Sequence, residues 1–183
     1  TDNDFALARY DADGTLDITF GSGGKTTTNF GPGGDMGLAL VVLDSGKILV
    51  SGTAYNGTDH DFALARYDAD GTLDATFGSG GKTTTDFGYG DDGSYALAVL
   101  EGGKVLASGY ASNPIDNDFA LVRYNSDGTL DTSFGSGGKT TTDFGFGDDR
   151  VQAMAVLDSG KILVSGYAFN GTDFDFALAR YDS

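Results

Sequence analysis

The chain contains no cysteine and only two prolines among its 183 residues. Without cysteine, neither a disulfide framework nor a thiolate metal site is possible. Basic residues are also few: eleven lysines and arginines stand against twenty-seven acidic residues, for a formal net charge of −16. This negative charge repels phosphate backbones and anionic lipid headgroups, so we expect no nucleic-acid partner. No apolar run approaches the roughly 20 residues of a membrane-spanning helix, so we expect no membrane insertion.

Glycine and aromatic residues are abundant instead. The sequence has thirty glycines, and aromatic residues make up 12% of it. This composition is typical of strands punctuated by turns. The length suits one folded unit rather than several unrelated ones. We therefore expect a single all-β domain over residues 1–183.

A 57-residue repeat runs through the chain without insertion or deletion. The string DFALARY returns, once as DFALVRY, at 4–10, 61–67, 118–124 and 175–181. The string FGSGGKTTT is unchanged where it begins at Phe20, Phe77 and Phe134. The repeat divides the domain into units 4–60, 61–117 and 118–174, with the start of a fourth at 175–183.

Each unit offers four candidate strands. DFALARY alternates Phe, Leu and Arg with Ala, Ala and Tyr, so both faces are largely apolar, as in a sheet covered on both sides. A stretch such as LALVVL, ending at Leu43, is too short for an ordinary helix and predicts a buried strand. DSGK or EGGK then predicts a hairpin turn with glycine at positive φ, before an ILVSG-type strand. KTTT is polar and β-branched, which suits an edge strand.

Antiparallel sheets that are apolar on both faces must stack against copies of themselves, and radial stacking gives a β-propeller. With the LALVVL-type strand innermost, each blade runs LALVVL, ILVSG, DFALARY, KTTT. The chain then supplies the outer two strands of one blade, two full blades and the inner three strands of another. Three blades fall below the four to eight usual for the fold, so we expect an open array or completion by oligomerisation. A β-trefoil is the main alternative, although 57 residues per unit are many for its lobes.

The string DFALARYDADGTLDATFGSGGKTTTDFG at 61–88, followed by ALAVL, GGKVL and SGY, resembles the delta-60 repeat. The resemblance extends over nearly the whole chain. It implies a propeller-like β fold and a secreted or cell-surface location on a bacterium. It implies no catalytic or ligand residues.

Three turns place oxygen-bearing side chains around a glycine, which is the hard-ligand chemistry that calcium prefers. The candidate metal ligands are Asp11, Asp13, Asp17, Asp68, Asp70, Asp74, Asn125, Asp127 and Asp131. The structural alternative is a β-turn whose Asp or Asn side chains accept hydrogen bonds from their own backbone. Asp91 with Asp92, and Asp148 with Asp149, are weaker calcium candidates. No other cofactor is expected.

Catalysis requires an asymmetric set of acid, base and nucleophile in one pocket, whereas almost every polar residue here is repeated. The single histidine, His60, occupies a variable position that is Asn3, Asn117 or Phe174 in the other units. GSGGKT at 21–26 lacks the first glycine of a phosphate-binding loop and leads into a strand rather than a helix. We therefore expect no enzymatic activity and no catalytic residue.

The repeated arginines lie on the Phe and Leu face of a strand that is expected to be buried. They are Arg9, Arg66, Arg123 and Arg180. A buried charge must be paired, so each position predicts a structural ion pair with an aspartate.

Two functions are compatible with these features. The first is an extracellular self-associating scaffold joined head to tail into a ring or filament, because its two unlike ends form a heterologous interface. The alternative is a module that binds a carbohydrate or a protein, with one site per repeat. For that alternative, the aromatic residues expected to be exposed are Tyr89, Tyr110, Phe146, Tyr167 and Phe169.

Overall fold

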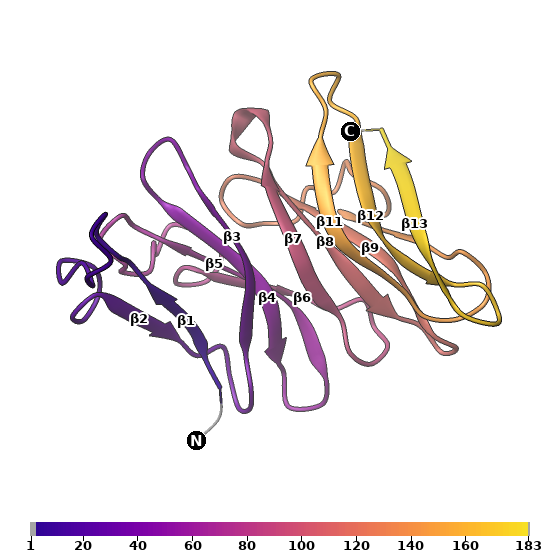
Figure 1. The fold of residues 1–183 in the computed structure, drawn as a ribbon, viewed down its shortest axis with the longest axis horizontal. Coiled ribbons are helices and arrows are strands. Elements are labelled where there is room, and N and C mark those ends of the chain that lie inside the picture. Colours follow the sequence, from indigo (N-terminus) through magenta and orange to yellow (C-terminus); the bar gives the residue numbers. More distant parts are fainter. Residues whose placement is uncertain (1–2, 183) are drawn as a thin grey trace.

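The computed structural model describes residues 3–182 as an all-β fold. Four antiparallel sheets stand side by side in chain order and do not close into a ring (Figure 1). The one helical segment among residues 3–182 is the single turn η1 (Glu101–Gly103). No helix of this described part is long and apolar enough to cross a membrane. The strands pair only within these four separate sheets, so the alternative prediction of a β-trefoil is wrong.

The number of strands in each sheet agrees with the predicted blades. The first sheet contains β1 (Phe5–Ala8) and β2 (Lys25–Thr28). The second contains, in order, β3 (Met36–Val42), β4 (Ile48–Tyr55), β5 (His60–Tyr67) and β6 (Lys82–Thr85). The third contains β7 (Gly93–Val99), β8 (Val105–Ser112), β9 (Asn117–Tyr124) and β10 (Lys139–Thr142). The last contains β11 (Asp149–Val156), β12 (Ile162–Phe169) and β13 (Phe174–Tyr181).

Local sequence explains the edges and turns of each sheet. The KTTT strands β2, β6 and β10 are all edge strands, as predicted. The turn between β3 and β4 contains Gly46 with φ of 81°, a backbone conformation that glycine adopts without steric cost. The innermost strands meet one another, because β7 contacts both β3 and β11. This contact supports the predicted position of the LALVVL-type strand.

Both faces of β5 are buried between neighbouring sheets. Phe62 and Leu64 on one face of β5 share a cluster with Val105 and Val122 of the next sheet. On the opposite face, Ala63, Ala65 and Tyr67 pack with Phe5 of the preceding sheet. The period-2 alternation of DFALARY therefore places apolar side chains in two separate interfaces, as predicted.

The prediction that the LALVVL-type strands are buried is wrong for β3, and also for β11, where Ala155 and Val156 are exposed and no sheet follows among residues 3–182. Leu40 and Val42 of β3 are exposed, whereas Leu97 and Val99 at the equivalent positions of β7 are half-buried. The physical reason is the missing neighbour. In the interior, β3 and β4 cover β7, but the sheet before β3 contains only the outer strands β1 and β2.

A tyrosine–threonine hydrogen bond joins each sheet to the one before it. Tyr124 Oη lies 2.7 Å from Thr85 Oγ1, and burial raises the pKa of this tyrosine. Replacing Tyr124 with phenylalanine is expected to lower the free energy of unfolding by about 1 kcal/mol, because the buried Thr85 hydroxyl loses its partner. The matched control is Tyr10→Phe, because Tyr10 is 62% exposed and should give no measurable change. Urea unfolding measures both variants, and equal losses would contradict the assignment.

Candidate functional site

The C-terminal sheet leaves one apolar face uncovered. Phe176 is 80% exposed and Leu178 is 59% exposed on β13. In contrast, Phe119 and Leu121, which occupy the same positions of the repeat in β9, are fully buried. The difference arises because the next sheet covers β9, while no sheet follows β13 among residues 3–182.

The N-terminal end has the opposite deficiency. Its first sheet contains two outer strands and lacks the inner two. An open groove of about 430 Å³ lies between β1 and the uncovered side of β3 and β4, lined by residues such as Leu7, Leu40 and Ile48. In the interior of the chain, inner strands of the preceding sheet occupy the equivalent space.

Strand edges are also incomplete at both ends. In the complete sheets, β5 and β9 pair on both sides. Within the described residues, β1 pairs only with β2, and β13 pairs only with β12. Each terminal DFALARY strand therefore has one backbone edge without a neighbouring strand, and such edges readily pair with another chain.

The repeated arginines form the predicted ion pairs in three of the four units. Arg123 Nε donates to Asp131 Oδ2 at 2.8 Å, and Arg9 and Arg66 make the same contact with their aspartates. Each guanidinium also lies over a phenylalanine ring, at 4.7 Å for Arg123 and Phe134. Hydrogen bonds from Lys104 and Ser133 hold the pKa of Asp131 well below its usual range. Arg180 is exposed, and the given sequence has no residue eight positions after it.

The turns that were predicted to bind calcium adopt the alternative conformation. Asp13 Oδ1 accepts hydrogen bonds from the amide and hydroxyl of Thr15, at 2.9 and 2.7 Å. Asp70 and Asp127 make the same contacts two residues ahead, with Gly14 and its equivalents at positive φ. The third aspartate of each turn accepts a hydrogen bond from the arginine described above. At the first position of the turn, Asn125 donates a hydrogen bond to Thr129 Oγ1, and Asp68 forms an ion pair with Lys47. Most side-chain oxygens of these turns therefore already have hydrogen-bond or ion-pair partners. Calcium binding at these turns stays a prediction.

Two groups of aspartates that the sequence did not single out as sets lie elsewhere. One oxygen from each of Asp61, Asp86 and Asp92 lies within 4.8 Å of the others. The same arrangement recurs 57 residues later, at Asp118, Asp143 and Asp149. Among residues 3–182, these are the acidic sets spaced closely enough to share a metal ion. The sequence signal that could have revealed these groups is the repeated aspartate that opens each DFALARY string. The other two aspartates of each group are far from it in the sequence, because a turn and a KTTT strand lie between them.

Hydrogen bonding fixes the position of each group. Asp92 Oδ2 accepts from the amide of Phe87 at 2.7 Å, and Asp92 Oδ1 accepts from the amide of Ser112 at 3.0 Å. Burial raises the pKa of Asp92 to about 7, and the negative charges of Asp86 and Asp61 act in the same direction. Burial likewise raises the pKa of Asp61. The carboxylates therefore meet at a cost in charge repulsion and desolvation.

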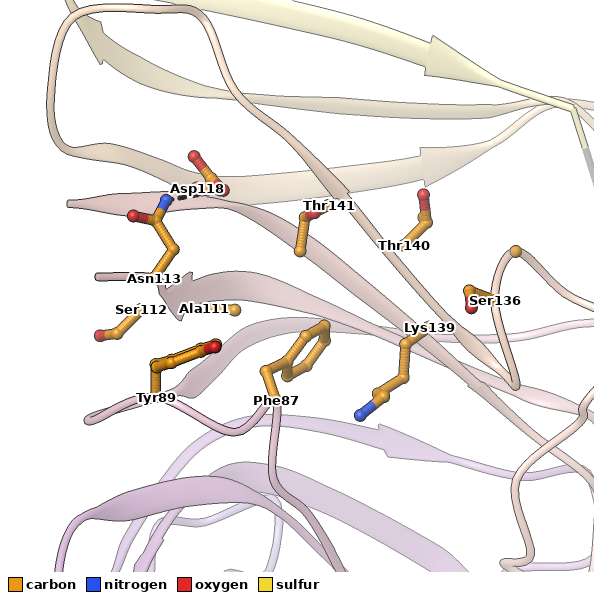
Figure 2. Close-up of a pocket in the computed structure, with 11 residues that line it drawn as sticks. Phe87, Tyr89, Ala111, Ser112, Asn113, Asp118, Ser136, Lys139, Thr140 and Thr141 are labelled. Carbon is orange, nitrogen blue, oxygen red and sulfur yellow. Dashed lines mark hydrogen bonds between the residues drawn. The ribbon is translucent and has the colours of Figure 1, made fainter. Parts of the chain in front are cut away.

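A pocket of about 520 Å³ opens between the third sheet and the segment that precedes it. Figure 2 shows Phe87 and Tyr89 on one side and Thr140 and Thr141 of β10 on another, with Asn113 hydrogen-bonded to Asp118. The position of Tyr89 is Pro32 in the preceding unit and Phe146 in the following one, so an aromatic ring at this position is present in two of the three units.

The five aromatic residues expected to be exposed divide into three sets. Tyr89 and Phe146 are exposed, and Tyr167 and Phe169 are partly buried. The expectation for Tyr110 is wrong, because this side chain is buried. Its ring stacks on Tyr95 and lies 4.2 Å from the Arg150 guanidinium carbon. The structure thus gives no equivalent exposed aromatic in every unit.

Comparison with known proteins gives one family. A family model described as a domain of unknown function (DUF5122) β-propeller matches residues 1–20, 44–77, 103–134 and 158–183, more than half of the chain. These segments contain the DFALARY strands and the turns that flank them. A search of curated proteins found no match.

Proposed function

The chain belongs to the DUF5122 β-propeller family, and from this premise we propose that it is a structural module that associates head to tail through its incomplete terminal sheets. The occupant of each uncovered face is a second copy of the same chain. In this proposal the module acts outside the cell or on the surface of a bacterium, as the resemblance to delta-60 repeats implies. It has no catalytic role.

The observation that supports the proposal is the contrast between equivalent residues. Phe119 and Leu121 are buried by the following sheet, while Phe176 and Leu178 present the same chemistry to solvent. An uncovered apolar sheet face next to an unpaired strand is a typical association surface. Because the interior interfaces are formed by copies of one repeat, a second chain offers the complementary face with the correct spacing.

Where the C-terminal sheet of one chain meets the N-terminal sheet of the next, which we call the join, the two sheets together contain five strands, one more than a blade. Strands β1 and β13 carry the same DFALARY sequence and occupy the same place in a blade. A composite four-stranded blade therefore uses β11 and β12 from one chain and β2 from the other, with only one of the two DFALARY strands between them. Two chains joined at both ends contain six blades, within the four to eight of closed propellers. If the rotation does not close, the same join makes a filament.

Charged substitutions on the two faces test this proposal. Variant C carries Phe176→Asp with Leu178→Asp, and variant N carries Leu40→Asp with Val42→Asp, all at exposed positions. Each variant alone is expected to stay monomeric, because an unpaired carboxylate at an apolar interface is strongly unfavourable. An equimolar mixture is expected to form a dimer and nothing larger, because one intact join remains. Analytical ultracentrifugation measures the masses.

The control is Ile115→Asp, at a loop residue that is 90% exposed and lies on neither face. This variant should associate like the parent chain. A parent chain that is monomeric at all concentrations would overturn the proposal. If variant C alone still forms dimers, the join is between like ends, and the head-to-tail arrangement is wrong.

A second candidate function is binding of a carbohydrate in the pocket of Figure 2. The exposed ring of Tyr89 beside Asn113 and Thr141 is the observation that favours it, because sugars stack on aromatic faces and hydrogen-bond to neighbouring polar groups. Loss of glycan-array binding in Tyr89→Ala, with binding retained in the Phe146→Ala control, would support it. Unchanged binding in both variants would contradict it.

A further inference from the structure

The aspartate group Asp61, Asp86 and Asp92 lies where one blade passes to the next. Asp61 belongs to β5, Asp86 directly follows β6, and Asp92 directly precedes β7. Their oxygens come within 4.8 Å of one another, although the three residues come from separate segments. None of the ion pairs among residues 3–182 involves these three carboxylates.

An unpaired buried oxygen lies in each group. Asp61 is 5% exposed, and its Oδ1 atom has no hydrogen-bond partner, while its Oδ2 atom accepts from Asn56. Asp118, the equivalent residue in the next unit, also has a buried Oδ1 atom without a partner. Buried carboxylate oxygens are normally hydrogen-bonded, and leaving one unpaired is costly. The same atom of Asp4, the equivalent residue of the first unit, is also buried without a partner, so this oxygen is left for a further ligand in all three units.

We propose that each group binds one divalent metal ion of the calcium type, so that the chain holds two such ions. The first site consists of Asp61, Asp86 and Asp92, and the second of Asp118, Asp143 and Asp149. This assignment is independent of self-association.

The ligand chemistry favours calcium over other common metals. All three ligands are carboxylates, and hard oxygen ligands suit Ca²⁺ and Mg²⁺ rather than zinc or copper. Opposite ligands of a Ca²⁺ ion are up to about 5 Å apart, and those of a Mg²⁺ ion up to about 4 Å. The three oxygens lie within 4.8 Å of one another, close enough to share a Ca²⁺ ion, whose coordination geometry is flexible. Asp86 is exposed while Asp92 is fully buried, so one side of the site is open to water ligands.

The first unit of the chain provides a natural comparison. Asp4 and Asp35 occupy the positions of Asp61 and Asp92, but Asn29 replaces Asp86. Asn29 Oδ1 still accepts a hydrogen bond from the amide of Gly31 at 2.7 Å, the same turn contact that Asp86 makes with Gly88. An asparagine at this position therefore keeps the turn and removes one negative charge.

This comparison defines the test variant. Asp86→Asn with Asp143→Asn converts both groups to the composition of the first unit. The matched control is Asp44→Asn with Asp158→Asn, which removes the same charge at exposed turn positions outside both groups. Circular dichroism of the metal-free proteins checks that both variants fold.

Calorimetric titration of the chelator-treated full chain with CaCl₂, and separately with MgCl₂, measures binding. The parent chain and the Asp44/Asp158 control are expected to bind two Ca²⁺ ions each, with weaker affinity for Mg²⁺. The Asp86/Asp143 variant is expected to bind Ca²⁺ at least about tenfold more weakly, because affinity depends on the number of charged ligands. Calcium should also raise the melting temperature of the parent chain more than that of this variant, since ligand binding to the folded state stabilises it.

Two results would overturn the proposal. Absence of calcium binding in the parent chain would mean that the unpaired oxygens are satisfied by a shared proton instead. Equal weakening in the test and control variants would mean that calcium associates diffusely with an acidic surface.

Discussion

Replacing Phe119 with alanine is expected to lower the free energy of unfolding by about 4 kcal/mol, whereas the same change at Phe176 should cost under about 0.5 kcal/mol in the dilute monomer. Both residues are the phenylalanine of a DFALARY-type strand. Phe119 is fully buried and packs edge to face on Phe144, at 5.0 Å between ring centroids. Phe176 is 80% exposed. Removing the first ring leaves a cavity, while removing the second reduces apolar surface in water.

Urea unfolding at low protein concentration measures this pair. Similar losses in both variants would show that the last sheet is already covered in the monomer, which would contradict the open fold. The Phe176→Ala variant also tests self-association. If a second chain covers β13, the melting temperature of the parent chain should rise with protein concentration, and Phe176→Ala should reduce this dependence.

Replacing Gly109 with alanine is expected to destabilise the chain by about 3 kcal/mol or more. This glycine lies on β8 opposite a β-bulge, where the pairing shifts between Ser94 and Ala96 of β7. A Cβ atom on Gly109 would lie 1.8 Å from the carbonyl oxygen of Gly93, which is backbone and cannot rotate away. The bulge or the strand pairing must therefore move, and the sheet loses hydrogen bonds or packing.

Gly34→Ala is the control for this experiment. A Cβ atom there meets only the Asn3 side chain at 4.0 Å, and the backbone is outside the positive-φ region. The control is expected to change stability by less than about 0.5 kcal/mol. Thermal unfolding of both variants tests the prediction, and a Gly109→Ala protein as stable as the control would show that the bulge can relax.

The repeat itself determined much of the architecture. The 57-residue period, the alternation of DFALARY and the glycine-containing turns predicted four strands per unit and the order in which they pair. The ion pair of Arg123 with Asp131 was also predictable, because a buried guanidinium requires an anion and aspartate recurs eight residues later. These features depend on local sequence or on neighbours that every repeat shares.

The candidate sites were less predictable for a different reason. Asp61, Asp86 and Asp92 come together only after β5 and β6 have paired and the loop has crossed to the next sheet. The acidic turns had a more obvious pattern, yet Asp13 and its equivalents bond to threonines two residues away. A pattern of acidic residues along the chain does not show whether nearby backbone and hydroxyl donors already satisfy their oxygens.

The sequence by itself determined the all-β repeat, its strands and turns, and the apolar faces that must be covered. Only the tertiary structure decided which copies of those faces are covered. Phe119 and Phe176 have the same local sequence but opposite exposure, because burial depends on the next sheet in space. The tertiary structure likewise decided which aspartates converge, since that distance depends on how separate strands pair and stack rather than on spacing along the chain.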